Sequence, residues 1–158
     1  MKYWLFKSEP DDFSIDDLAC SANQTTFWFG IRNYQARNFI RDELQPGDQI
    51  LFYHSSCAVP AVVGTAVIKS AAQVDNTAFD PQSPYFDAKS DPHKPRWFGV
   101  DIGFLSKFAQ PVSLRFIKQD PQLQQMYLVA KGNRLSIQPV AADEWQRIVA
   151  LGAKQQPA

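Results

Sequence analysis

The chain has 158 residues, of which 45% are hydrophobic and 20% charged, a balance that excludes a disordered protein and allows one buried core. Its 16 basic and 16 acidic residues cancel, which excludes nucleic-acid binding through overall positive charge and leaves a local patch or a shaped pocket. No apolar run reaches the length of a membrane helix, which is about 20 residues. The first residues lack a signal-peptide pattern, and two cysteines are too few for a secreted disulfide scaffold. We therefore expect a cytoplasmic protein with reduced thiols, folded as a single domain over residues 1–158.

The N-terminal elements are short. The apolar run 3–7 predicts a strand that the turn sequence SEPDD ends. Ser14 followed by Asp17 predicts the capping box of a short helix that reaches Cys20. The polar residues 21–26 predict a loop.

A helix is predicted from about Asn33 to Leu44, because apolar residues recur there at helical spacing and Pro46 and Gly47 follow. The apolar stripe expected to face the core consists of Ala36, Phe39, Ile40 and Leu44.

Strand and loop patterns alternate in the rest of the chain. Gly64 predicts a bulge or a close backbone approach. The proline-rich segment 75–96 predicts a long loop, and Pro121 the start of a helix. The expected strands are 49–55, 61–71, 96–108 and 134–140, and the expected helices are 112–120, 121–129 and 141–152, the last ended by Gly152. Short strands without regularly alternating helices favour an α+β fold, a small, curved or closed mixed β-barrel with peripheral helices, over a parallel βαβ fold.

Catalytic and metal-binding patterns are weak. The sequence YHSSC offers His54, Ser55 and Cys57 together, but neighbouring residues of a strand point to opposite faces and do not pair as nucleophile and base. Two histidines and two cysteines give no metal-ligand spacing, and no glycine-rich phosphate loop is present, so we expect no metal and no cofactor. An enzyme acting on a nucleotide-like or RNA substrate remains an alternative, with Glu9 or Asp101 as general acid or base and His54 as its partner.

Amides, arginines and aromatics are concentrated at the start of the helix predicted from Asn33. A helix start presents free backbone N–H groups and a partial positive charge, which suit a phosphate or the edge of a base. Aromatic rings stack on unpaired bases and contribute about 1–3 kcal/mol per base. The grouped residues are Arg32, Asn33, Tyr34, Gln35 and Arg37. The same aromatics could instead belong to the hydrophobic core. A cavity formed by these residues could also bind a small molecule, so both alternatives stay open.

Five sequence segments resemble the EVE domain family in the same order: WLFKSEP, WFGIRNYQARNFIRD, ILFYHSS, WFGVDI and RLSIQPV. The resemblance extends from Tyr3 to about Leu151. It implies a PUA-like fold related to the YTH and ASCH domains. It also implies a non-enzymatic module that recognises a modified base of DNA or RNA in an aromatic pocket.

The resemblance further implies which residues form this pocket. It places Ser8 and Glu9 at the rim, Trp28 and Trp97 as aromatic walls, Asn33 and Gln35 as amide contacts, Tyr53, His54 and Ser55 at the floor, and Leu135 and Ser136 on the far side. The phosphate partners it implies are Lys7, Arg32 and Arg37. Phe29 stands where members of the family often carry a polar residue, which affects the choice of base. On this basis Trp28→Ala is expected to remove base selectivity and to leave the fold intact.

Overall fold

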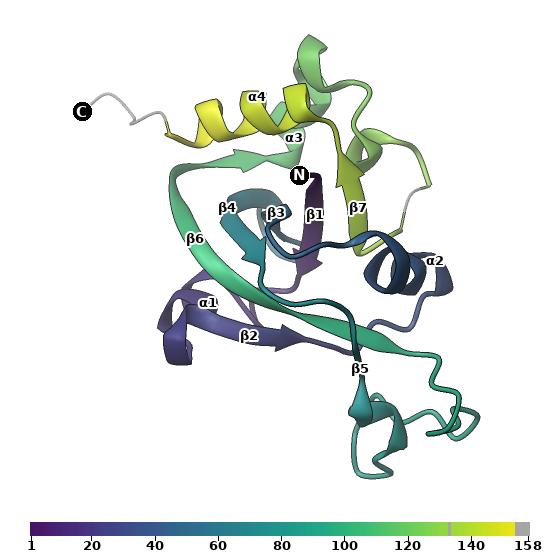
Figure 1. The fold of residues 1–158 in the computed structure, drawn as a ribbon. Coiled ribbons are helices and arrows are strands. Elements are labelled where there is room, and N and C mark those ends of the chain that lie inside the picture. The colour runs from purple at the N-terminus through teal and green to yellow at the C-terminus, as the bar shows by residue number, and fades with distance from the viewer. Residues whose placement is uncertain (133, 154–158) are drawn as a thin grey trace.

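The computed structural model describes residues 1–132 and 134–153. Six strands form one sheet in the order β2-β6-β4-β3-β1-β7, and a seventh, β5, pairs with β6 (Figure 1). The strands are β1 (Tyr3–Ser8), β2 (Thr25–Trp28), β3 (Gln49–His54), β4 (Ala61–Ile68), β5 (Gln73–Val74), β6 (Phe98–Ser113) and β7 (Ile137–Val140). The helices are α1 (Ile15–Cys20), α2 (Tyr34–Asn38), α3 (Leu114–Gln119) and α4 (Ala142–Ala153). Among these helices none is long and apolar enough to cross a membrane.

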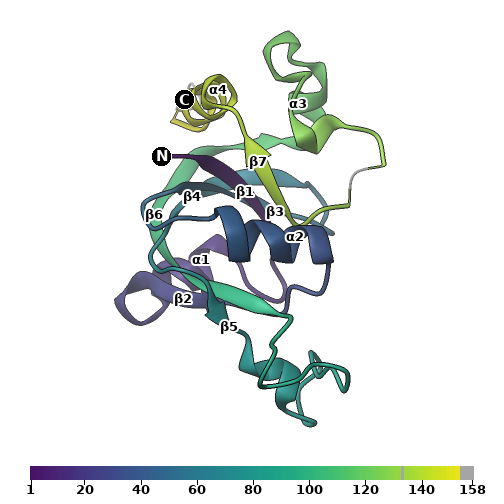
Figure 2. The same ribbon diagram turned by 45° about the vertical axis from the view of Figure 1, so that its right-hand side comes forward.

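The sheet is strongly curved but open, so the expected α+β fold is confirmed and its closure into a barrel is not. The long strand β6 bends around the molecule and pairs with β2, β4 and β5 (Figures 1 and 2). β2 and β7 form the two edges of the sheet, and α2 lies beside β7 in both views. Helix α2 and the turn that follows it pack Ala36, Ile40 and Leu44 into the interior, as the predicted apolar stripe requires. These side chains fill the open side that strand pairing would fill in a closed barrel.

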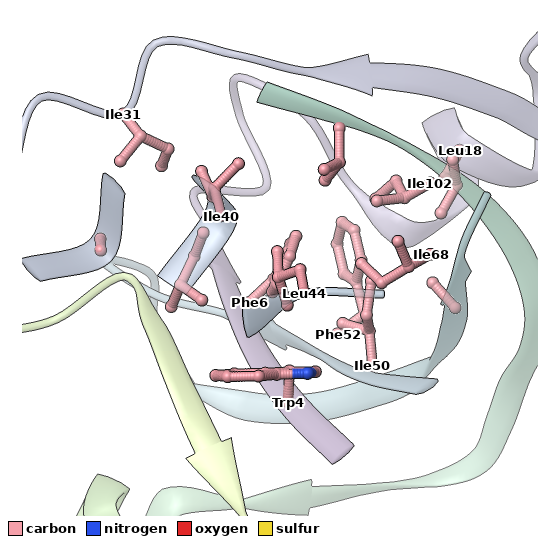
Figure 3. Packing of buried hydrophobic residues seen from close by; sticks show 14 of the residues in the cluster. Trp4, Phe6, Leu18, Ile31, Ile40, Leu44, Ile50, Phe52, Ile68 and Ile102 are labelled. Atoms are coloured by element: carbon pink, nitrogen blue, oxygen red, sulfur yellow. The ribbon is translucent and has the colours of Figure 1, made fainter. Parts of the chain in front are cut away.

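Side-chain alternation along β1 produces two hydrophobic clusters. Trp4 and Phe6 point into the curve of the sheet, where they meet Ile40, Phe52 and other buried side chains (Figure 3). Leu5 points to the other face and belongs to a second cluster, which α3 and α4 cover. The strand β1 is therefore buried on both faces, and its C-terminal end is held firmly.

The helix predicted from Asn33 to Leu44 is confirmed, and its second half is a π-turn. Asn33 is the N-cap, and its side chain accepts the Ala36 N–H at 3.0 Å. The α-helix ends at Asn38, and residues 39–43 form a π-turn in which the Leu44 N–H donates to the Phe39 carbonyl. A single π-turn has no compositional signature that a sequence would reveal.

Other boundaries also differ from those expected. Strand β2 occupies part of the predicted loop 21–26 and runs on to Trp28, β6 extends to Ser113, and β7 begins only at Ile137. The second helix of the predicted pair is replaced by two 3-10 turns, at Pro121–Leu123 and Tyr127–Val129.

Two local predictions are confirmed. Ser14 and Asp17 form the capping box of α1. The register shifts between Val62 and Gly64, where a Cβ atom would collide with the Ser106 carbonyl oxygen. Gly64 therefore lets β6 approach β4 at a bulge.

Candidate nucleic-acid interface

Three of the sequence segments meet at the C-terminal end of β1. Because β1 and β3 are parallel and in register, Ser8 lies opposite His54. The Ser55 N–H donates to the Ser8 carbonyl at 2.9 Å, and the Lys7 N–H donates to the Ser136 carbonyl at 2.8 Å. Backbone pairing thus brings together residues 7–9, 53–55 and 136, which are far apart in the sequence.

A pocket of about 330 Å³ lies between the turn after β1 and the edge strand β2. Four of the predicted site residues line it together, namely Lys7, Ser8, Glu9 and Trp28. The other lining residues are Asp12, Phe13, Thr26, Phe27, Phe29, Ile31 and Tyr85. This pocket is the candidate site.

Trp28 forms the inner wall of the candidate site and is anchored in the core. Its ring centroid lies 5.7 Å from that of Phe6, 6.0 Å from that of Phe13 and 5.8 Å from that of Phe52. The indole is consequently held in one position by three neighbouring rings. Such a wall presents a fixed surface to a flat ligand.

Two more exposed aromatics form the outer rim. Phe29 is 45% exposed and Tyr85 39% exposed, and their rings meet edge to face with centroids 5.6 Å apart. The Tyr85 ring rests on Gly30, where a Cβ atom would fall 2.8 Å from its Cε1 atom. Gly30 also has φ +82°, a conformation that favours glycine, so this position serves both the turn and the ring contact.

Arg32 fixes the loop that carries Tyr85. Its five N–H groups make five hydrogen bonds, to the carbonyls of Ile31 and Tyr85 (twice), to the Thr77 hydroxyl and to the Asp75 carboxylate. A guanidinium has five such donors, so none is left for a phosphate in this structure. Arg32 was predicted to bind phosphate; the structure places it instead as the residue that positions the rim.

Asp75 is the partner of Arg32 and is completely buried. It accepts hydrogen bonds from the Arg32 Nη1 at 3.0 Å and the Gly30 N–H at 2.8 Å, and also from the backbone and hydroxyl of Thr77. Burial raises the pKa of Asp75, but the hydrogen bonds from Thr77, Gly30 and Arg32 outweigh burial and hold the pKa below its usual value. The loop and the segment after β2 are therefore joined through one charged group.

Several predicted site residues lie away from the candidate site. Asn33 and Gln35 line a separate hollow of about 490 Å³ together with Leu135. Its remaining lining residues are Tyr127, Ala130, Lys131, Gly132 and Arg134. The Asn33 side chain is also used as the helix cap, which limits what it offers a ligand.

Trp97 packs against α2, and Arg37 is a residue of that helix. Trp97 is 5% exposed, stacks on Tyr34 with centroids 4.9 Å apart, and donates its Nε1–H to Asp87 at 2.7 Å. The Arg37 guanidinium lies 5.0 Å from the Tyr34 ring centroid and donates to the Arg96 carbonyl. Trp97 thus does not line the pocket that contains Trp28.

Tyr53 lies on the face of the sheet opposite Trp28. It is buried in the second cluster, and burial raises its pKa to about 12. The Lys7 ammonium lies 6.0 Å from the Tyr53 ring centroid, and burial lowers the pKa of Lys7. Within residues 1–132 and 134–153 no carboxylate forms an ion pair with this ammonium, which leaves a half-buried positive charge at the margin of the candidate site.

The acid–base groups of the enzyme alternative are separated. The His54 Nε2 accepts the Ile15 N–H at 3.1 Å, and the Asp101 carboxylate accepts from the Gln73 amide at 3.2 Å. In the described part of the chain no hydrogen bond links His54 to Glu9 or Asp101, and no three potential metal ligands come together. The geometry favours a structural role for His54.

Burial of the His54 imidazole makes the stability of the fold depend on pH. Burial lowers the pKa of His54 from 6.5; Lys107 lowers it further, and Asp16 and Asp17 raise it. Below pH 6.5 the unfolded chain binds a proton that the folded chain resists, so the free energy of unfolding should fall as the pH falls from 6.5 through the lower native pKa. Chemical denaturation at pH 7.5 and pH 5.5 measures this loss.

His54→Gln is the matched variant, because a glutamine oxygen accepts the Ile15 N–H without titrating. We expect its unfolding free energy to change less between the two pH values than that of the unaltered protein. His93→Gln, at the exposed histidine, serves as the control and should retain the full pH dependence. Equal pH dependence in His54→Gln and the unaltered protein would show that His54 contributes nothing to it.

The sequence did not identify most of the pocket wall. Phe13, Phe27 and Tyr85 line the pocket but carry no individual sequence signal. The nearest indication was the proline-rich segment 75–96, which predicted a long loop without selecting Tyr85.

Residues 2–151 match the EVE domain family. The chain is 39% identical to thymocyte nuclear protein 1 of Gallus gallus and 36% identical to that of Homo sapiens, covering 94% and 97% of this chain and 68% and 75% of those proteins. A crystal structure of a Pseudomonas syringae protein has TM-score 0.89 and 49% identity over 95% of this chain and 99% of that one. The human THYN1 protein in complex with 5-methylcytosine-containing DNA has TM-score 0.91 and 35% identity, covering 99% of this chain and 100% of the other.

A fold likeness also extends to an ASCH protein of Zymomonas mobilis, with TM-score 0.56 at 13% identity over 96% of this chain and 99% of that chain.

The expectation of a cytoplasmic protein is contradicted by the vertebrate relatives, which are named nuclear proteins. The composition of the sequence does not separate the two compartments. The family match spans residues 2–151, and the five ordered segments lie within it. The chain therefore belongs to the EVE domain family.

Proposed function

We propose that this protein binds DNA that carries a modified base, takes that base into the pocket beside Trp28, and performs no chemistry on it. The observation that carries the proposal is the aromatic-walled pocket of about 330 Å³, in a chain 35% identical to a human protein whose structure contains 5-methylcytosine DNA. 5-Methylcytosine is accordingly the first base to test.

The pocket has the properties needed to hold one base turned out of a duplex. Its volume is near the lower end of the range for ligand sites, about 300–1000 Å³, which suits a single base. Trp28 provides a stacking face, and the carboxylates of Glu9 and Asp12 can accept hydrogen bonds from an exocyclic amino group such as that of cytosine. The phenyl rings of Phe13 and Phe27 give the apolar contact that a methyl group requires.

The other predicted residues are assigned by their position. Lys7 and Arg37 stay as the proposed phosphate partners, since the donors of Arg32 are used within the protein. Asn33 and Gln35 line a different hollow and are proposed to contact the nucleic acid outside the base pocket. The likeness to the ASCH protein supports assigning the fold to the PUA-like group.

Fluorescence anisotropy with short oligonucleotides tests the proposal. The panel contains single- and double-stranded DNA and RNA with cytosine, 5-methylcytosine or other modified bases at one central position. A methyl group in an apolar pocket contributes at least about tenfold, so we expect about that preference for 5-methylcytosine over cytosine.

The salt dependence of binding distinguishes recognition in the pocket from contacts to phosphates. Raising the salt concentration should weaken binding to all oligonucleotides, while the ratio between modified and unmodified bases should persist. Equal affinity for every oligonucleotide at both salt concentrations would contradict the proposal.

A further inference from the structure

A second hollow, of about 490 Å³, lies on the other side of Phe27 and Phe29 from the candidate site. Both rings line both spaces. They are nearly parallel, with an interplanar angle of 12° and centroids 6.2 Å apart. We call this space the outer hollow; it is lined by Thr26, Phe27, Phe29, Gln73, Val74, Asp75, Asn76, Thr77 and Asp101.

Strand register explains why the outer hollow is open. Phe27 of β2 lies opposite Asp101 of β6, and Gln73 of β5 lies opposite Gly99 of β6, so these positions share one face of the sheet. A Cβ atom at Gly99 would fall 2.7 Å from the Phe27 Cζ atom. Glycine therefore lets the Phe27 ring lie flat on the sheet and leaves the space above Asp101 and Gln73 unfilled.

Two of the polar side chains that line the outer hollow are carboxylates, those of Asp75 and Asp101. The Asp101 carboxylate accepts one hydrogen bond, from the Gln73 Nε2, and its second oxygen has no partner among the residues that the structure describes. The side chain of Asn76 is exposed and makes no hydrogen bond to any other described residue. A carboxylate only accepts, so a ligand group that contacts Asp101 must be a donor.

We propose that the outer hollow binds the nucleobase next to the one held in the pocket, and that it selects a base with an exocyclic amino group. This inference rests on the proposed function. The flanking base stacks on the exposed ring of Phe29, and its amino group donates to Asp101. Adenine, cytosine and guanine carry such a group, whereas thymine and uracil present a carbonyl oxygen there, which a carboxylate repels.

The position of the outer hollow supports a neighbouring nucleotide in the same strand. The two spaces share Thr26, Phe27 and Phe29 as lining residues, so they are adjacent, and one strand could place neighbouring bases in both. Lys69 lies across Gly103 on the same face of β6, and its side chain is exposed. Its ammonium is available to the phosphate that joins the two nucleotides.

Anisotropy with single-stranded DNA of one central 5-methylcytosine tests the inference. The bases on its 5′ and 3′ sides are changed in turn from adenine to thymine. At one of the two sides, thymine should weaken binding by about fivefold to tenfold, because the amino group that donates to Asp101 is lost.

Asp101→Asn should remove this dependence, since an asparagine amide pairs with either kind of base edge. It should leave the ratio between 5-methylcytosine and cytosine unchanged. Asp143→Asn removes the same charge from α4, remote from both hollows, and should retain the flank preference.

Phe29→Ala should weaken binding of every oligonucleotide by about tenfold and remove the difference between flanking bases, because the stacking face is gone. Phe86→Ala is the matched control: Phe86 lies in the loop 75–96, is exposed to a similar degree as Phe29, and lines neither hollow. Its binding should equal that of the unaltered protein.

The outcomes separate the two proposals. Preference for 5-methylcytosine without any dependence on the flanking base would overturn the proposal that the outer hollow binds a base, and would leave the proposed function standing. Retained flank preference in Asp101→Asn would overturn the role of the carboxylate. A protein that distinguishes neither the central base nor its neighbours overturns both proposals.

Discussion

Asp75→Asn is expected to lower the free energy of unfolding by about 3 kcal/mol, because it breaks a buried ion pair. Asp75 is fully buried, and its carboxylate is the shared acceptor for Gly30, Arg32 and Thr77. Asparagine keeps the shape of the side chain but removes its charge. Its amide NH2 group would also face the donors that now point at the carboxylate. The guanidinium of Arg32 is then left without its counter-charge in a largely buried position.

Urea denaturation at pH 7 measures this loss. Asp80→Asn, in the same loop but exposed, is the matched control, because asparagine can still accept the Gln82 N–H. It should change the unfolding free energy by less than about 0.5 kcal/mol. A loss below about 1 kcal/mol in Asp75→Asn would show that the ion pair is not what joins the loop to β2.

The same variant links stability to the binding site. Arg32 holds the Tyr85 carbonyl, and Tyr85 forms part of the pocket rim.

Because the native pKa of Asp75 is below its ordinary value of 3.8, the contribution of Asp75 to the free energy of unfolding is complete above that value and disappears as the pH falls through the native pKa. Asp75→Asn should therefore show a smaller loss of stability in acid than the unaltered protein.

Local patterns in the sequence predicted local structure well. The capping box at Ser14 and the bulge at Gly64 each depend on a few neighbouring atoms, and both are present. The apolar stripe from Ala36 to Leu44 faces the core as predicted, although the backbone changes from an α-helix to a π-turn within it.

The composition of the site depended on contacts that no local pattern records. The family resemblance placed Trp28 and Trp97 in one aromatic pocket, but strand pairing puts Trp28 over the core and a stack with Tyr34 holds Trp97 beside α2. Arg32 looked like a free cation, because its partner Asp75 is 43 residues away. The sequence did not predict strand β2, because only pairing with β6 makes an extended strand of Thr25–Trp28.

Trp28→Ala is expected to destabilise the fold by about 3 kcal/mol, which departs from the expectation that the fold would stay intact. Trp28 touches the rings of Phe6, Phe13 and Phe52, so alanine would leave a cavity between the core and the pocket. Thermal or urea unfolding measures the loss. An unfolding free energy within about 1 kcal/mol of the unaltered protein would show that the neighbouring rings close the gap.

Loss of binding by Trp28→Ala would thus not separate a missing wall from a loosened fold. Trp28→Phe does so, because a phenyl ring keeps much of the core contact and presents a smaller stacking face to the base. We expect Trp28→Phe to lose about 1 kcal/mol of stability and to reduce the preference for 5-methylcytosine over cytosine by about fivefold.

Trp145→Phe provides the control for stability alone. Trp145 is buried in the second cluster, stacks on Tyr3 with centroids 4.7 Å apart, and lies outside the pocket. Its replacement should cost a comparable amount of stability without changing the ratio between modified and unmodified DNA. If Trp28→Phe and Trp145→Phe keep the same ratio as the unaltered protein, Trp28 is a core residue and the base is read by another wall of the pocket.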